Sequence, residues 1–160
     1  MSATRTMGIS VTDVDTEAKL PLGFVYREPA AGDDKGEKHW IYIENAESSA
    51  SLIAGTVVGR LSATSEVKGI LCPTSETTAR IIGVAQHTIV AGSFGFILLK
   101  GIGSVLIDTG VSANAGLISG DGTAGRADAG TALTSPTFAY SLAAISTGEV
   151  GTCYINCAGA

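Results

Sequence analysis

The fold is decided by the stretch Ile81–Lys100, which reads IIGVAQHTIVAGSFGFILLK. It holds three short apolar runs, over residues 81–85, 87–90 and 94–100, separated by small or turn-forming residues. Val, Ile and Phe are enriched in strands, and Gly marks the turns between them. The stretch therefore predicts consecutive β-strands joined by tight turns.

The same texture continues on both sides of this stretch. Further strand-length runs occupy residues 56–61, 67–71, 104–107, 138–143 and 150–157, and no segment keeps helical periodicity for three turns. Upstream, strands over Leu22–Glu28 and His39–Glu44 flank a polar turn and predict a hairpin. The segment Gly110–Pro136 is almost wholly small and polar, and we predict a long surface loop there. The fold class is all-β, a small Gly-rich barrel or sandwich.

The chain divides into an extended N-terminal arm over residues 1–20 and a single β domain over residues 21–160. The domain contains the hairpin, residues 22–44, and a β core, residues 51–160. The arm has too little apolar surface to offset its ordering cost, so we expect it to be mobile by itself. Ile9, Val11 and Val14 nearly alternate within it, which suits an edge strand added to another protein.

A weak internal repeat occurs at an offset of 56 residues. It pairs Ile82 with Phe138, Val84 with Tyr140, Ile89 with Ile145, Gly92 with Gly148, Phe94 with Val150 and Gly95 with Gly151. Both copies read as a strand, a turn ending in Gly, and a second strand. The repeat indicates two similar β units packed together.

Composition and charge narrow the possible partners. Hydrophobic residues make up 45% of the chain and charged residues 16%, which excludes an intrinsically disordered protein. The net charge is -5 and the ten Lys and Arg residues are scattered singly, so we expect no nucleic-acid partner. The sequence has no signal-peptide pattern and no apolar run near the ~18 residues of a membrane span, so we expect neither secretion nor a membrane partner.

Few side chains could carry catalysis or bind a metal ion. The two histidines, His39 and His87, do not stand at metal-ligand spacing from a cysteine or carboxylate. Cys153 and Cys157 would lie on one face of a strand about 13 Å apart, beyond the reach of a disulfide, and only Cys72 remains as a further thiol. We expect no enzymatic activity, no cofactor, no bound metal and reduced thiols.

Two glycine-rich motifs and two acidic pairs have simpler explanations. Residues 91–95 (AGSFG) approximate a nucleophile elbow, but a strand-like run follows where the elbow needs a helix. Residues 120–125 (GDGTAG) have the spacing of a dinucleotide-binding loop, yet they lie inside the predicted surface loop. The acidic pairs at 13 and 15 and at 33 and 34 lack the Gly and distal Glu of a calcium loop. We predict turns and solvated loops for all four.

Several segments together resemble a known family. They are His39–Ala46 (HWIYIENA), Leu52–Val58 (LIAGTVV), Ile82–Gln86, Ile89–Gly92 and Gly95–Gly101, with Phe138–Ala143 and the C-terminal strand to Cys157 similar again. Their glycine placement and strand rhythm resemble the small Gly-rich decoration (cement) proteins on the capsids of tailed bacteriophages. The resemblance covers about residues 22–157 and involves no signature side chain.

The resemblance implies a structural virion protein, made in the host cytoplasm and located on the capsid surface. Such a protein binds the outer shell, bridges neighbouring major capsid proteins, associates with itself as a homotrimer and needs no cofactor. Candidate contacts with the capsid or with neighbouring subunits are Ile9, Val11 and Val14 of the arm and Trp40 of the hairpin. The alternatives are another phage structural subunit, such as a tail, baseplate or adhesin β domain, and an enzyme or ligand binder with a deep pocket at His87.

Overall fold

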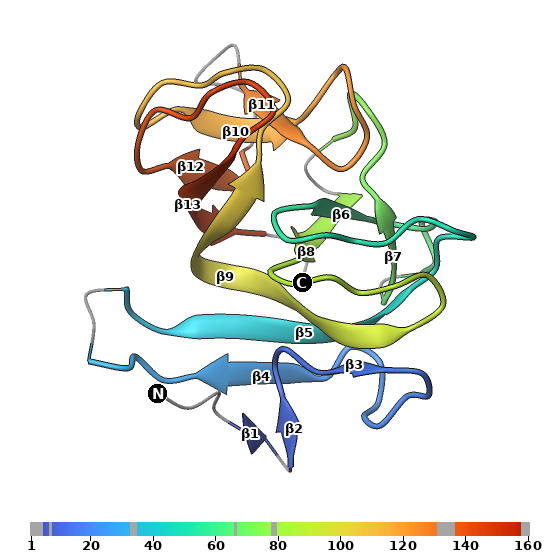
Figure 1. Cartoon of the computed structure of the whole chain (residues 1–160). Helices are drawn as coiled ribbons and strands as arrows, with labels where there is room; N and C mark the ends of the chain where they lie inside the picture. Colours follow the sequence, from blue (N-terminus) through green and yellow to red (C-terminus); the bar gives the residue numbers. More distant parts are fainter. Residues whose placement is uncertain are drawn as a thin grey trace.

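The computed structural model describes residues 5–6, 8–32, 35–65, 67–77, 80–130 and 137–157, with side chains from residue 8 onward except at Ile9. Within these ranges the chain is nearly all β, as the sequence predicts (Figure 1). The strands are β1 (Arg5–Thr6), β2 (Ile9–Ser10), β3 (Val14–Asp15), β4 (Val25–Glu28), β5 (Lys38–Asn45), β6 (Val57–Arg60), β7 (Lys68–Leu71), β8 (Ile81–Val84), β9 (Phe94–Leu106), β10 (Gly116–Ser119), β11 (Ala127–Ala129), β12 (Ala139–Ser141) and β13 (Val150–Asn156). The described residues contain no helix long and apolar enough to cross a membrane.

The longest strand, β9, runs through the centre of the molecule and turns sharply midway (Figure 1). The sequence predicts two strands here, because Gly101 and Gly103 separate the apolar runs. The structure has one continuous strand of 13 residues, in which Gly101 adopts a φ of 122° that favours glycine. Its first half pairs with β5 and its second half with β13, both antiparallel, so backbone pairing continues through the bend.

The first half of β9 belongs to a closed five-stranded barrel, which we call the first unit. Its strands follow the cyclic order β5, β9, β8, β6, β7, and parallel pairing between β7 and β5 closes the ring. The interior is narrow, because a Cβ at Gly69 would lie 2.6 Å from Val58 Cγ1 and 2.7 Å from Ile43 Cδ1. Gly69 thus leaves room for branched side chains to fill the barrel.

The second half of β9 and the rest of the chain form a second unit with the same cyclic order: β9, β13, β12, β10, β11. Ala127 of β11 forms a parallel bridge with Ile107, the residue that directly follows β9. The prediction of a long loop over Gly110–Pro136 is wrong for its described part, residues 110–130, which contains β10 and β11. Its small residues suit a narrow barrel interior, where Ala127 is as fully buried as Leu117.

The two units repeat one pairing pattern. The strand pair Val84–Leu98 of the first unit is equivalent to Tyr140–Tyr154 of the second. The isolated bridge Leu52–Ile89 of the first unit is likewise equivalent to Val111–Ile145 of the second. In both units a glycine with positive φ, Gly92 or Gly148, follows the bridge and leads into the next strand. The structure therefore confirms the 56-residue repeat and the prediction of two similar β units. β9 takes part twice, because its first half corresponds to β13 and its second half to β5.

In each copy of the repeat, an isoleucine packs against the glycine six residues later. A Cβ at Gly95 would lie 3.0 Å from Ile89 Cδ1, and a Cβ at Gly151 would lie 2.3 Å from Ile145 Cδ1. Both isoleucines are buried. The missing side chain therefore lets the bridge segment lie directly on the strand that follows it.

Residues 8–20 lie against the first unit instead of extending from it. β3 pairs with β9 through Val14–Gly95 and Asp15–Phe94, and Val11 and Leu20 are buried. The expectation of a mobile arm omitted the burial of these two side chains and the contacts of Asp15 described below. Residues 1–4 and 7 lie outside the described part of the chain.

The predicted hairpin is present as β4 and β5. Its first strand begins at Val25, later than predicted, because Phe24 N–H donates to the Pro21 carbonyl at 3.1 Å in a turn. Gly23 in that turn has a φ of 84°. Between the hairpin strands, Asp33 and Asp34 lie outside the described residues.

Replacing Gly151 with alanine tests the contact between Ile145 and Gly151. The added methyl overlaps Ile145, and overpacking of this kind costs about 1–3 kcal/mol, so Gly151→Ala should lower the free energy of unfolding by that amount. The control is Gly130→Ala, because a Cβ there would meet its nearest atom, Ile118 Cγ2, at an ordinary 3.4 Å. Urea denaturation of both variants measures the effect, and equal stabilities for the two would contradict the close contact.

Candidate interaction surfaces

The four predicted contact residues lie in different surroundings. Trp40 is 5% exposed, and its indole N–H donates to Glu28 Oε2 at 2.8 Å. Val11 is also buried, whereas Val14 on β3 is 39% exposed. The side chain of Ile9 lies outside the described part of the structure. Contact of these residues with another protein stays a prediction, and Val14 offers the accessible side chain among the three described.

A buried polar contact holds the N-terminal segment on the first unit. Asp15 is 4% exposed, and its Oδ2 accepts a hydrogen bond from the Tyr42 hydroxyl at 2.9 Å. Its Oδ1 pairs with Lys19 Nζ at 2.5 Å, and the Tyr42 hydroxyl accepts from the Lys19 backbone N–H at 3.3 Å. Burial raises the pKa of Tyr42 to about 12, so the hydroxyl keeps its proton and donates it to the carboxylate. We call Asp15, Lys19 and Tyr42 the anchor.

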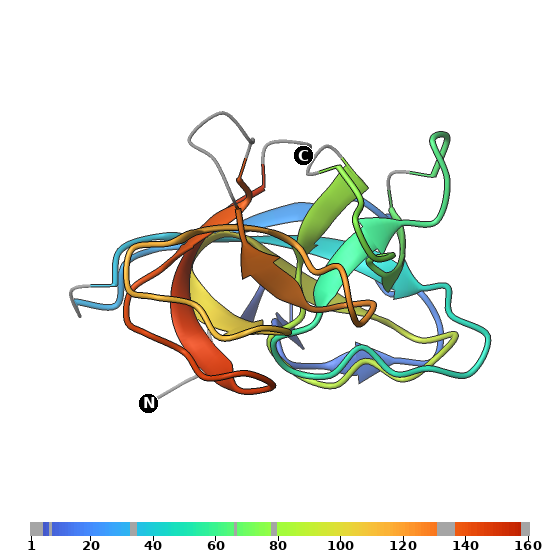
Figure 2. The same ribbon diagram turned by 90° about the horizontal axis from the view of Figure 1, so that it is seen from above.

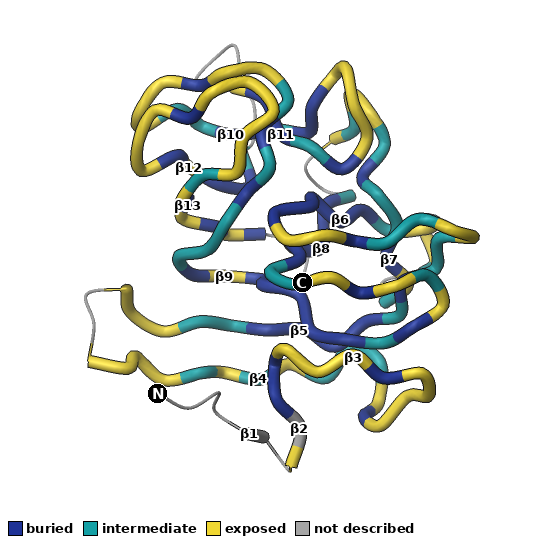
Figure 3. The backbone as a smooth tube through the Cα atoms, viewed as in Figure 1, coloured by how far each residue is buried: buried dark blue, intermediate teal, exposed yellow. Residues whose placement is uncertain are grey.

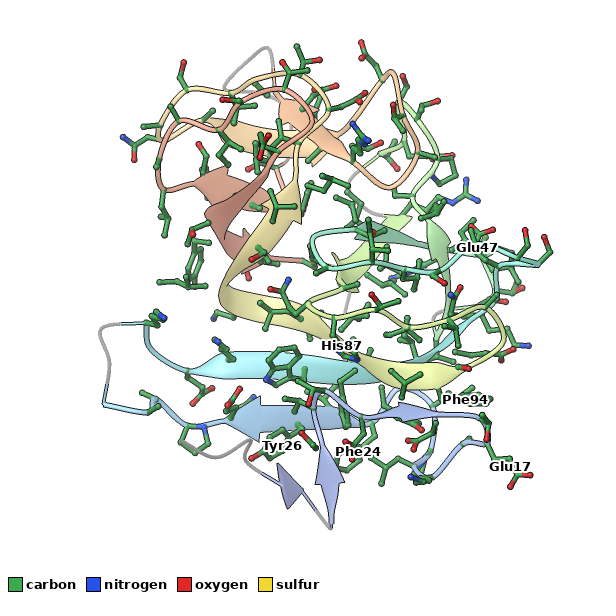
Figure 4. The ribbon with its side chains drawn as sticks, in the orientation of Figure 1. Glu17, Phe24, Tyr26, Glu47, His87 and Phe94 are labelled. Atoms are coloured by element: carbon green, nitrogen blue, oxygen red, sulfur yellow. The ribbon has the colours of Figure 1, made fainter. Side chains whose placement is uncertain are left out.

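Aromatic rings surround the anchor on the outer face of the first unit. Tyr42 lies with its ring centroid 5.1 Å from that of Phe96 and 6.5 Å from that of Phe94. Phe24 comes from the turn before β4 (Figure 4). Its ring meets that of Phe96 edge to face, with the centroids 6.5 Å apart. The N-terminal segment thus covers this face with polar contacts, and the turn before β4 covers it with an apolar contact.

An acidic cluster in the second unit binds its own backbone. Ligand atoms of Asp108, Asp121 and Asp128 lie within 4.8 Å of one another. Asp108 Oδ2 accepts the Thr123 N–H at 2.8 Å and the Gly122 N–H at 3.0 Å. Burial opposes ionisation of Asp108, yet these hydrogen bonds hold its pKa below the usual value. Asp128 likewise accepts two backbone N–H groups, so the carboxylates shape the loop between β10 and β11.

The described residues also line an open hollow of about 380 Å³ beside β6. Its lining residues are Arg60, Ser62, Ala63, Thr77 and Arg80. Arg80 already pairs with Glu76 through Nη1 at 2.5 Å and donates from Nε to the Arg60 carbonyl at 3.2 Å. The hollow includes neither histidine.

His87 lies in the link between β8 and β9 (Figure 4). Both of its ring nitrogens are buried and lack a hydrogen-bond partner among the described residues. Burial lowers the pKa of His87, and the nearby charge of Asp13 offsets this only in part. His39, in contrast, contacts Glu37 at the surface. The imidazole of His87 is therefore neutral at pH 7.

The three cysteines are free and buried. Burial raises the pKa of Cys72 and Cys153 to about 11 and that of Cys157 to about 12. They remain thiols at neutral pH, and their place in the core shows a packing role.

The sequence analysis missed one surface, the outward side of β12, β13 and the second half of β9. We call it the outer face of the second unit. Tyr140 and Tyr154 stand directly opposite each other on it and are 50% and 37% exposed. The signal was present in the sequence, because Tyr154 alternates with the buried Cys153 and Ile155. Buried and exposed stretches alternate along β13 in Figure 3.

Comparisons with known proteins add a likeness in fold. No family model matches the chain, and no curated protein matches its sequence. The chain resembles a solved bacteriophage structure. This is the N base of head fiber gp8.5 in bacteriophage phi29, with a TM-score of 0.52 and 13% sequence identity. The match covers 73% of this chain and 92% of that chain, so the likeness extends over nearly the whole base.

Replacing Tyr42 with phenylalanine tests the anchor. The change removes the hydroxyl that donates to the buried Asp15 carboxylate, and an under-satisfied buried acceptor costs about 1–3 kcal/mol. Tyr42→Phe should lower the free energy of unfolding by that amount, measured in urea. The control is Tyr26→Phe, in the half-buried part of β4. Equal stability of both variants would argue against the anchor.

The buried imidazole predicts a pH dependence of stability. The unfolded chain protonates His87 below about pH 6.5, whereas the folded protein holds the ring neutral to lower pH. The unfolded state then binds more protons, so stability falls as the pH falls through this range. Urea midpoints at about pH 7.5 and about pH 5.5 should differ less for His87→Leu than for the wild type. An identical difference in wild type and His87→Leu would contradict this.

Proposed function

We propose that this chain is a structural protein of a bacteriophage head, which binds the outer capsid surface and stabilises the shell by bridging neighbouring major capsid proteins. The observation that carries the proposal is the shared fold with the N base of a phage head fiber, over 92% of that base. The glycine placement and strand rhythm of the sequence support the same class of protein. The proposed role assigns the chain no catalytic step and no cofactor.

The distribution of charge supports a protein partner over nucleic acid. The chain carries a net charge of -5, and two of its basic side chains, Lys19 and Arg80, are paired with carboxylates at 2.5 Å. A phosphate backbone needs clustered free cations, which these pairs do not provide. The proposed partners are the major capsid protein and further copies of this chain in a homotrimer.

A second candidate is another phage structural subunit, in a tail, baseplate or adhesin. A repeated β unit with apolar outer faces is compatible with that role as well. The two candidates differ in where the protein lies on the particle, so its position distinguishes them.

Binding to purified shells tests the proposal. Expanded capsids are purified from a mutant of the encoding phage that lacks this gene. Tagged protein is mixed with these capsids, and the mixture is sedimented. We expect the protein to sediment with the shells, to raise their melting temperature and to add density on their outer surface in cryo-EM. Density on tails alone would favour the second candidate, and failure to sediment with any particle would contradict both.

The same assay tests the exposed residue of the N-terminal segment. Val14→Asp should lower the amount bound if β3 contacts the shell, because a charge would then be buried without a partner. The control is Val90→Asp, an exposed valine in the link before β9. Equal occupancy by both variants would show that Val14 makes no contact.

A further inference from the structure

The outer face of the second unit is apolar and exposed. Besides Tyr140 and Tyr154, it includes Leu142 at 47% and Val150 at 48% exposed. Ile102 and Leu106, which stand opposite Tyr154 and Val150 on β9, are half-buried. These side chains come from adjacent strands, so they form one patch instead of scattered exposed residues.

This face carries no charged side chain over eight positions, and Lys100, which stands opposite Asn156 on β9, marks its charged edge. The eight positions are Ile102, Ser104 and Leu106 on β9, Tyr140 and Leu142 at β12, and Val150, Thr152 and Tyr154 on β13. The chain as a whole carries a net charge of -5. A surface without charges on an acidic protein can be desolvated without burying an unpaired ion, which is what the centre of a protein interface requires.

The first unit shows what happens to the equivalent face. Val84 and Leu98 correspond to Tyr140 and Tyr154, and both are completely buried. Tyr42 occupies the position that Ser104 has in the second unit. Asp15 and Lys19 of the N-terminal segment cover the Tyr42 hydroxyl, and Phe24 from the turn before β4 covers Phe96. Leu98 lies against Gly103 in the second half of β9.

Within the described residues the second face has no such cover. Strands β12 and β13 lie on the side of the molecule opposite to β6, β7 and β8 (Figure 2). The N-terminal segment is committed to the first unit through the anchor.

We propose that a second copy of this chain covers the outer face of the second unit. Charge favours a copy over a charged partner, because the same face on another molecule is equally uncharged and raises no repulsion where the two acidic chains meet. Opposed tyrosines suit such a contact, since they bury a large apolar ring while the hydroxyl keeps a polar partner. The contact is the surface through which the homo-oligomer of the proposed function forms, and in that respect it rests on the proposed function.

The test is the mass of the free protein in solution. Light scattering at about 1 μM to about 100 μM covers contacts of micromolar strength. We expect the wild type to have two or three times the mass of one chain, as in closed symmetric assemblies. Tyr154→Lys should lower the mass about two- to threefold to that of one chain, with unchanged circular dichroism. The matched control, Val25→Lys, alters a strand residue on β4 that is 45% exposed, against 37% for Tyr154, and should leave the oligomer intact.

A second variant keeps the test decisive if Tyr154→Lys folds poorly. Leu142→Glu introduces a charge just beyond the end of β12, where the side chain is 47% exposed and the backbone N–H donates to the Thr152 carbonyl at 3.0 Å. It should also yield single chains. A wild type of single-chain mass over the whole range, or two folded variants that remain oligomeric, would overturn the proposal.

Shell binding of the same variants separates this inference from the proposed function. Loss of the oligomer in Tyr154→Lys, without shell binding even by the wild type, would support the contact and contradict the function. If the wild type is monomeric and binds shells through this face, then the capsid protein is the partner of the face, and the proposed contact between copies is wrong.

Discussion

The structure depends on the continuous backbone pairing of β9. One strand of 13 residues supplies a member both to the closed barrel of the first unit and to the second unit, with β5 along its first half and β13 along its second. Every other strand of the two cyclic orders reaches its place by pairing outward from β9. Gly101 is the residue that makes this possible, because its φ of 122° lets the strand change direction while its hydrogen bonds continue.

The duplicated units differ mainly in what lies on their outer faces. The first unit buries Tyr42 beneath the N-terminal segment and Leu98 against Gly103 of β9, whereas the second unit presents Ser104 and Tyr154 at the same positions. The inner faces are alike, since Ile89 on Gly95 and Ile145 on Gly151 keep the same close contact. The two units thus share this inner contact while their outer residues differ.

Local patterns in the sequence were enough for the fold class, for most strands and for the repeat. Alternation over residues 150–157 places Cys153 and Ile155 inside and Tyr154 outside, as the structure has them. β10 and β11 could not be predicted, because their small residues carry the composition of a loop and become strands through pairing with distant segments. The anchor could not be predicted either, because Asp15 and Tyr42 are far apart in sequence and the residues around each give no sign of the contact. The exposure of Tyr140 depends on whether another segment covers it, which no local pattern contains.

The sharing of β9 also determines how the molecule behaves under load. Domains usually move relative to one another at a flexible linker that few contacts cross. Here the connection between the two units is itself a hydrogen-bonded strand, with β5 and β13 holding its two halves. We therefore expect a pull on one unit to reach the other along β9, and not to be taken up by a slack linker.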